Sequence, residues 1–188
     1  MNHHPELINL VKIAKILDEL GIAYYVTGGF AVSIYGRPRF TADVDMVIKM
    51  LSPQVSDMAA RLKKIFPNGY VDENQINDAL MQQGEFNVID PESGLKVDFF
   101  ISKDNEFEKE CFQATLEKDF GYPVKFISPE NLILSKLIWF KESLSTRQLE
   151  DIASVLEVQE KIDQKYLQTW IKKLDLEAEW QKLKELKN

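Results

Sequence analysis

Residues 26–48 read VTGGFAVSIYGRPRFTADVDMVI, and the residue types in this stretch follow an informative order. Residues 22–27 are β-branched and aromatic, which predicts a short buried strand. Two glycines follow at 28–29, and residues 30–35 predict a short helix. In residues 43–49 apolar side chains alternate with others, which predicts a second strand. The stretch therefore predicts a strand, a glycine turn, a helix, a loop and a strand.

Two carboxylates open the second of these strands, at Asp43 and Asp45. Because side chains alternate across a strand, both carboxylates point to one face, with Cα atoms about 7 Å apart. Two carboxylates on one face repel each other unless a cation lies between them. Mg²⁺ suits such a pair, since it binds carboxylate oxygens and keeps positions open for substrate phosphates. We therefore expect a divalent-metal site at Asp43 and Asp45.

A third carboxylate lies in the later apolar segment Leu95–Ile101, which also reads as a strand. Asp98 has the same parity in it as Lys96, and a lone acid is costly to bury unpaired. If this strand lies beside residues 43–48, Asp98 completes a triad around one or two ions. The alternative is an acid that faces solvent at the edge of a sheet, and the residues alone leave both open.

The pair Gly28 and Gly29 lies between a predicted strand and a predicted helix. Glycines there permit close approach of the backbone to a ligand. The N–H groups and the positive dipole end of the following helix favour an anion. A glycine pair alone is often only a tight turn, but its position ahead of the Asp-x-Asp strand favours a phosphate site.

This combination resembles the nucleotidyltransferase superfamily related to DNA polymerase beta. The pattern of that family is an apolar strand, Gly-Gly or Gly-Ser, a spacer, Asp-apolar-Asp, and a third acid on a later strand. The matching residues here are Gly28-Gly29, Asp43-Val44-Asp45 and Asp98. Residues 36–43 look closest to the abortive-infection-type branch and its small bacterial relatives, in which an Arg-x-Thr-x-Asp-apolar-Asp pattern is common. Arg39, Thr41, Asp43 and Asp45 match that pattern.

The resemblance continues into the C-terminal part of the chain. Residues 128–137 are similar to the Pro-Glu-x-Leu…Lys segment of the family, and residues 150–152 to its Asp-Ile helix. The resemblance implies an α+β fold, with a mixed β-sheet flanked by helices and followed by a C-terminal helical bundle. We expect an α/β core over 1–127 and a helical domain over 128–188, where only helical patterns remain.

The resemblance also implies an activity. It is the Mg²⁺-dependent transfer, with Mn²⁺ as a substitute ion, of a nucleoside monophosphate from an NTP such as ATP to an acceptor hydroxyl. The acceptor implied by the resemblance is a tRNA 3′ end, a protein or a small molecule. The resemblance is also compatible with a role in a toxin–antitoxin or phage-defence system, together with a cognate partner protein. It assigns catalysis and metal binding to Asp43, Asp45 and Asp98. It assigns nucleotide binding to Gly28, Gly29, Arg39, Thr41 and Lys136.

Two of these basic residues have alternative interpretations. Lys136 lies in the apolar helical segment 129–143, so it needs an anionic partner. The resemblance supplies the nucleotide phosphates, whereas pairing with Asp151 would make Lys136 structural. For Arg39, phosphate contact and an ion pair with Asp43 are both open. For the whole chain, the alternatives are a non-catalytic nucleotide- or partner-binding module and an antitoxin-type enzyme that modifies a partner toxin.

Composition limits the class of protein. The net charge is −7, without the basic excess that is typical of proteins that wrap nucleic acid. No apolar run approaches the roughly 20 residues of a membrane span, and a cytoplasmic location is expected. The single cysteine, Cys111, permits no internal disulfide and is interpreted as a packed thiol. His3 and His4 are interpreted as part of a polar terminus.

Two local expectations concern helix boundaries. Ser52 precedes Pro53 and is expected to cap a helix that runs to about Phe66. Residues 103–119 carry mixed charges and are expected to be helical.

Overall fold

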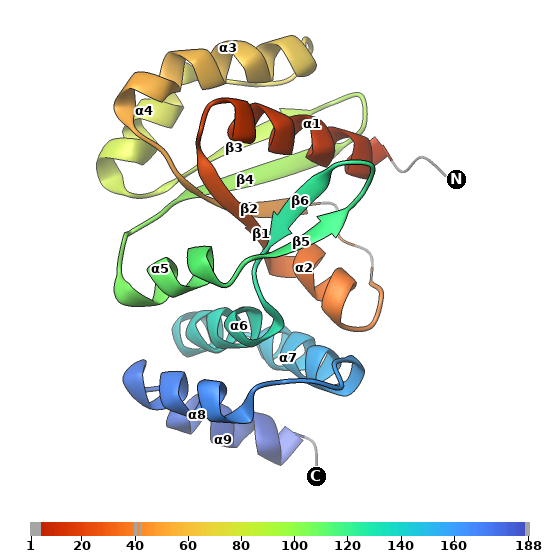
Figure 1. Cartoon of the computed structure of the whole chain (residues 1–188), viewed down its shortest axis with the longest axis vertical. Coiled ribbons are helices and arrows are strands. Elements are labelled where there is room, and N and C mark those ends of the chain that lie inside the picture. The colour runs from red at the N-terminus through yellow and green to blue at the C-terminus, as the bar shows by residue number, and fades with distance from the viewer. Residues whose placement is uncertain (1–4, 40, 42, 187–188) are drawn as a thin grey trace. The chain divides into compact units, whose positions relative to one another are not determined.

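The structure is a computed structural model that describes residues 5–39, 41 and 43–186. Within this part of the chain six strands form one mixed sheet, in the order β3-β4-β2-β1-β6-β5 (Figure 1). The strands are β1 (Ala23–Thr27), β2 (Asp43–Lys49), β3 (Glu85–Asp90), β4 (Leu95–Ile101), β5 (Leu116–Asp119) and β6 (Pro123–Phe126). β2 pairs in parallel with β4 and antiparallel with β1, whose other neighbour, β6, is parallel to it. The predicted α+β fold with a mixed sheet is confirmed.

The described residues divide into two compact units. The first contains residues 1–30 and 41–127 and the second contains residues 31–40 and 128–188, each as far as the structure describes them. The first unit holds α1 (Pro5–Glu19), the 3₁₀ helix η1 (Ser52–Gln54), α3 (Val55–Ile65), α4 (Glu73–Gln82) and α5 (Glu106–Gln113). The second holds α6 (Pro129–Ser143), α7 (Thr146–Val158), α8 (Gln164–Lys173) and α9 (Glu177–Leu186). α2 (Gly28–Tyr35) begins in the first unit and continues in the second, which thus includes a segment from within the first predicted domain.

In the first unit both faces of the sheet are covered by helices. Figure 1 shows α1 and α3 on one side of the sheet and α5 on the other. Along β2 burial alternates, with Val44 and Met46 almost inaccessible and the residues between them more exposed. On the α5 side, Tyr25 packs against Phe112 with ring centroids 4.9 Å apart. Burial of each such large apolar side chain contributes about 1.5–3 kcal/mol to folding.

The second unit is helical and is organised around α6. Ser128 caps this helix, since its Oγ accepts a hydrogen bond from the backbone N–H of Asn131 at 3.2 Å, and Pro129 occupies the first turn. The helix ends at Leu144, which is left-handed with φ of 55°. α6 is apolar nearly all round and contacts α7, α8 and α9, so most of its side chains are buried. None of the helices in the part of the chain that the structure describes is long and apolar enough to cross a membrane.

The expectation of one helix over residues 103–119 is wrong in its second half. α5 ends at Gln113, and Leu116–Asp119 forms β5, which pairs with β6 in a hairpin. The turn is stabilised by Gly121, whose φ is +81° and whose N–H donates to Oδ1 of Asp119 at 2.8 Å. β5 lies at the edge of the sheet, where charged side chains are favoured, and this explains why its sequence resembled an exposed helix.

The expected cap at Ser52 is also wrong. Ser52 lies inside η1, and the residue ahead of it, Leu51, occupies the cap position. The side chain of Gln54 accepts a hydrogen bond from the backbone N–H of Leu51 at 2.8 Å, so the side-chain bond at this helix start comes from within the turn and not from a serine ahead of it.

Candidate active site

Three aspartates share one face of the sheet. Asp45 and Asp98 are direct partners in the register of β2 and β4, and Asp43 is the partner of Lys96. Register partners point to the same side of a sheet, and residues two apart on a strand do so too. We call Asp43, Asp45 and Asp98 the acidic face. The adjacency of the two strands is the arrangement that the triad hypothesis required.

Lys96 belongs to the same face, a position that the sequence-based site did not include. Its Nζ donates to Oδ2 of Asp98 at 2.6 Å. This hydrogen bond raises the pKa of Lys96 above its usual value, and the charges of Asp98, Asp43 and Asp45 add to the increase, against the opposing effect of burial. The signal available in the sequence was parity alone, since Lys96 and Asp98 are two apart on one strand.

The glycine turn holds the carboxylate of Asp45. Gly28 follows the last residue of β1 and has φ of +63°, and a β-carbon built on it would lie 1.8 Å from Oδ2 of Asp45. The backbone N–H of Gly29 points to the same oxygen at 3.4 Å. α2 begins at Gly28 and not at Phe30, so both glycines belong to the first turn of the helix. The turn therefore makes room for a carboxylate, and its contact with a nucleotide phosphate stays a prediction.

The acidic face suits a divalent cation in the type and placement of its donors. Three carboxylates on adjoining strands are hard oxygen ligands of the kind that Mg²⁺ binds. Asp45 is half-buried and Asp98 is 16% exposed in its side chain, so the donors are accessible from one side. In the described ranges, however, no three Asp, Glu, His or Cys side chains are already placed to hold a metal ion, and Asp98 is directed to Lys96. The residues fit the ion, and Asp98 would have to exchange its lysine partner for it.

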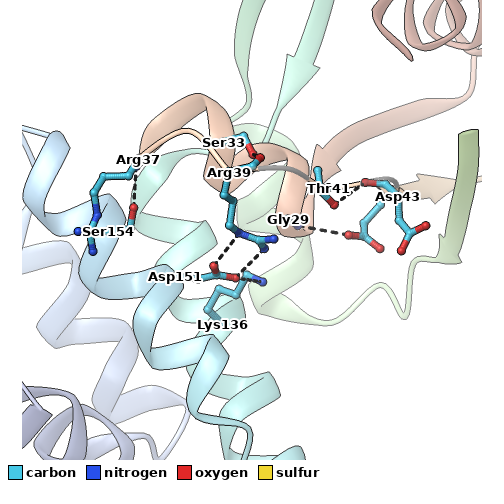
Figure 2. A network of polar contacts seen from close by, with 10 residues as sticks. Gly29, Ser33, Arg37, Arg39, Thr41, Asp43, Lys136, Asp151 and Ser154 are labelled. Atoms are coloured by element: carbon cyan, nitrogen blue, oxygen red, sulfur yellow. Dashed lines mark hydrogen bonds and ion pairs between the residues drawn. The ribbon is translucent and has the colours of Figure 1, made fainter. Parts of the chain in front are cut away.

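Thr41 holds the chain just ahead of the first aspartate. Its Oγ1 donates to the backbone carbonyl of Asp43 at 3.2 Å, as Figure 2 shows. The hydroxyl of Thr41 therefore holds the backbone here, whereas its assignment to nucleotide binding stays a prediction.

A second polar cluster lies within the helical unit, where Arg39 and Lys136 share the carboxylate of Asp151 (Figure 2). Lys136 Nζ lies 2.9 Å from Oδ2, and Arg39 contributes Nε at 3.0 Å from Oδ1 and a second nitrogen at 3.1 Å from Oδ2. Asp151 is buried, with a side chain that is 5% exposed. The structural alternative for Lys136 is therefore the contact observed, and the partner of Arg39 is Asp151 and not Asp43.

The loop between α2 and β2 is tied to α7 within the same unit. The backbone N–H of Arg37 donates to Oγ of Ser154 at 2.6 Å. Gly36 permits this contact, because a β-carbon there would lie 2.5 Å from the same hydroxyl. Gln159 adds a hydrogen bond to the carbonyl of Tyr35 at 2.6 Å. Sequence reasoning missed Ser154, since a serine in an amphipathic helix carries no signal for a partner far away in the chain.

Other candidate residues have structural roles or lie outside the described residues. Cys111 is fully buried, and this burial raises the pKa of its thiol to about 12, which agrees with the interpretation as a packed thiol. Trp170 and Trp180 are buried, whereas Trp139 is about half exposed. His3 and His4 lie outside the described residues.

Comparison with solved structures identifies the architecture. The crystal structure of ANT(2″)-Ia in complex with adenylyl-2″-tobramycin aligns with 98% of this chain and 99% of its own, with a TM-score of 0.57 and 15% identity. The chain has a nucleotidyltransferase fold. The lincosamide antibiotic adenylyltransferase LnuA shares this nucleotidyltransferase fold. It aligns with 82% of this chain and 97% of its own, with a TM-score of 0.55 and 13% identity. A nucleotidyltransferase-like protein from Paracoccidioides brasiliensis shares it too. It aligns with 96% of this chain and 93% of its own, with a TM-score of 0.52 and 22% identity.

The likeness at these identities is one of fold. No protein-family model matches the chain, and no curated protein matches it either.

Proposed function

We propose that the chain is a metal-dependent nucleotidyltransferase, which moves a nucleoside monophosphate from an NTP such as ATP to an acceptor hydroxyl. The observation that carries the proposal is the register of β2 and β4, which sets Asp45 opposite Asp98 with Asp43 two residues away on the same face. The glycine turn beside Asp45 and the nucleotidyltransferase fold support it.

The acidic face would hold the divalent ion, with Asp43, Asp45 and Asp98 as its ligands. When bound, such an ion neutralises charge that develops on the phosphate oxygens. Gly28 and Gly29 lie at the positive end of the dipole of α2, where an anion is favoured. Asp98 receives the proton of the acceptor hydroxyl as general base. The acceptor oxygen bonds to the α-phosphorus, the bond from that phosphorus to the β-phosphate oxygen breaks, and pyrophosphate leaves.

Arg39 and Lys136 are proposed to contact the phosphates. Two cations share the single carboxylate of Asp151, so this cluster carries an excess of one positive charge. A partly buried excess cation favours an anionic ligand, and a polyphosphate is such a ligand. Thr41 is proposed to assist nucleotide binding indirectly, because its hydrogen bond to the carbonyl of Asp43 holds the backbone next to that aspartate.

For the acceptor we propose a small-molecule hydroxyl. The net charge of −7 disfavours a long polyanion such as tRNA and suits a neutral or cationic acceptor. Two solved neighbours that this chain covers almost end to end were determined with antibiotics. ANT(2″)-Ia is in complex with adenylyl-2″-tobramycin, and LnuA is bound to lincomycin. The abortive-infection resemblance suggests a protein acceptor in a toxin–antitoxin pair. The test below therefore includes proteins as a separate acceptor pool. A cytoplasmic location is proposed with this activity.

The test is incubation with each α-labelled NTP and Mg²⁺ in three acceptor pools. The pools are a panel of aminoglycosides and lincosamides, total tRNA, and lysate proteins. We expect label on a small molecule, with loss of at least about a hundredfold in Asp45→Asn, because one charged ligand of the divalent ion is removed. Asp104→Asn is the matched control, since this exposed acid on the same unit pairs with Lys49 and should leave the rate unchanged. Label in none of the pools would favour a non-catalytic binding module.

A further inference from the structure

The acidic face already contains a cation of its own. Lys96 points along β4 to Asp98, whose register partner is Asp45, while Lys96 itself is opposite Asp43. With all four groups ionised, three negative charges are offset by one positive charge, which leaves −2. One divalent cation would neutralise that remainder.

The pair of Lys96 with Asp98 differs from an ordinary surface ion pair. Lys49, on the same face at the far end of β2, pairs with Asp104 at 2.5 Å, and both of these side chains are about half exposed. In the pair of Lys96 with Asp98 the lysine is 38% exposed and the aspartate only 16% exposed, so the carboxylate is the shielded partner. Ion pairs that are shielded from water interact more strongly and are screened less by salt. The ammonium of Lys96 therefore offsets repulsion among the three aspartates in the absence of any other cation.

We propose that Lys96 is a built-in cation of the acidic face, which competes with a divalent metal ion for Asp98 and sets the affinity for it. The inference rests on the proposed function in one respect, that the acidic face binds a divalent ion. An ion that engages Asp98 must displace the ammonium or share the carboxylate with it. In both cases the positive charge of Lys96 repels the ion and weakens its binding.

The test is titration of Mn²⁺ into chelator-treated protein without nucleotide, with free Mn²⁺ followed by electron paramagnetic resonance. We expect Lys96→Met to bind Mn²⁺ about tenfold more tightly than the wild type, because a unit positive charge a few ångströms from the ion is removed. Lys96→Arg keeps the charge and should stay within about twofold of the wild type. Lys49→Met is the matched control and should also stay within about twofold.

A second measurement separates competition from simple support of the fold. In the presence of EDTA, Lys96→Met should melt at a lower temperature than the wild type, because the aspartates lose their internal cation. Saturating Mn²⁺ should then raise its melting temperature by more than it raises that of the wild type. If Lys96→Met does not fold, Lys96→Gln replaces it in both measurements.

The outcomes distinguish this inference from the proposed function. Mn²⁺ affinity that is unchanged or lower in Lys96→Met, with normal binding by the wild type, overturns the inference alone. No saturable Mn²⁺ binding by the wild type or by any Lys96 variant overturns both. If Lys49→Met binds Mn²⁺ more tightly by the same factor as Lys96→Met, the effect is one of net charge in general. That result would also overturn the inference about Lys96.

Discussion

The carboxylate of Asp45 lies where a side chain at Gly28 would begin. A β-carbon at Gly28 would lie 1.8 Å from Oδ2 of Asp45, and the next two distances, to Cγ and Cβ of the same aspartate, are 2.5 and 2.8 Å. The glycine directly follows β1 and the aspartate lies on the neighbouring strand β2, since Thr27 at the end of β1 is the register partner of Asp45. The absence of a side chain at Gly28 therefore allows Asp45 to take its observed orientation.

Replacement of Gly28 by alanine should therefore impair the site beyond its effect on the backbone. The left-handed conformation costs a non-glycine residue about 1–2 kcal/mol, and the overlap with Asp45 comes in addition. Gly21→Ala is the matched control, because Gly21 has φ of +65° with nothing within 4 Å of the added carbon. We expect both variants to lose stability in urea unfolding, with the larger loss in Gly28→Ala, and only Gly28→Ala to lose Mn²⁺ affinity and transferase activity. Equal activities in the two variants would contradict this.

Removal of divalent ions should abolish transferase activity and lower thermal stability. Mg²⁺ at ten times its dissociation constant stabilises the native state by about 1.4 kcal/mol, which corresponds to about 3–6 °C in Tm for a chain of this size. The measurement is a thermal melt with and without EDTA. Asp45→Asn and Asp98→Asn should show no such difference, and a full Mg²⁺-dependent shift in Asp98→Asn would exclude Asp98 as a ligand.

Asp151→Asn should destabilise the helical unit. It leaves Arg39 and Lys136 without a carboxylate in a site where Asp151 is 5% exposed, and breaking a buried pair costs about 3–5 kcal/mol. Because Arg39 is one quarter exposed, we expect a value at the lower end of that range. Glu157→Gln, on the same helix but in an exposed pair with Arg37 at 3.6 Å, should cost less than about 1 kcal/mol. Chemical denaturation of both variants is the measurement, and similar losses in the two would contradict the difference expected from burial.

Lys136→Met distinguishes a phosphate ligand from a purely structural lysine. Asp151 keeps Arg39 as a partner in this variant, so the loss of stability should be smaller than in Asp151→Asn. If Lys136 contacts the nucleotide, the KM for the NTP should rise about tenfold or more, which corresponds to about 1.4 kcal/mol of binding. Steady-state kinetics against NTP concentration give this value. An unchanged KM together with lower stability would assign Lys136 to structure alone.

Cys111 should make the fold sensitive to alkaline pH. Burial raises the pKa of its thiol from 9.0 to about 12, so the native state keeps this proton at pH values where the unfolded chain loses it. The stabilisation from this group is full below pH 9 and is lost as the pH rises through 12. The free energy of unfolding should therefore fall above pH 9, and Cys111→Ala should reduce that slope. Native protein at pH 8 should also resist a thiol reagent that reacts in urea, and rapid reaction of the native protein would contradict its burial.

Local patterns were sufficient for several elements. The bounds of β2, β4 and α6 agree with the ranges expected from the sequence, because alternation along a strand and a Ser-Pro start of a helix are properties of neighbouring residues. The common face of Asp43 and Asp45 follows from the same local geometry. By contrast, the edge strand β5 was mistaken for a helix, since what makes it a strand is its pairing with β6.

The sequence by itself determined which residues are available for the chemistry: two aspartates on one strand, a glycine pair before them and a third acid of known parity. Only the tertiary structure decided their partners. It set Asp98 beside Asp45, paired Lys96 with Asp98 and directed Arg39 and Lys136 to Asp151. The physical reason is that strand order and ion pairing depend on contacts between segments far apart in the chain, which no periodicity within one segment records.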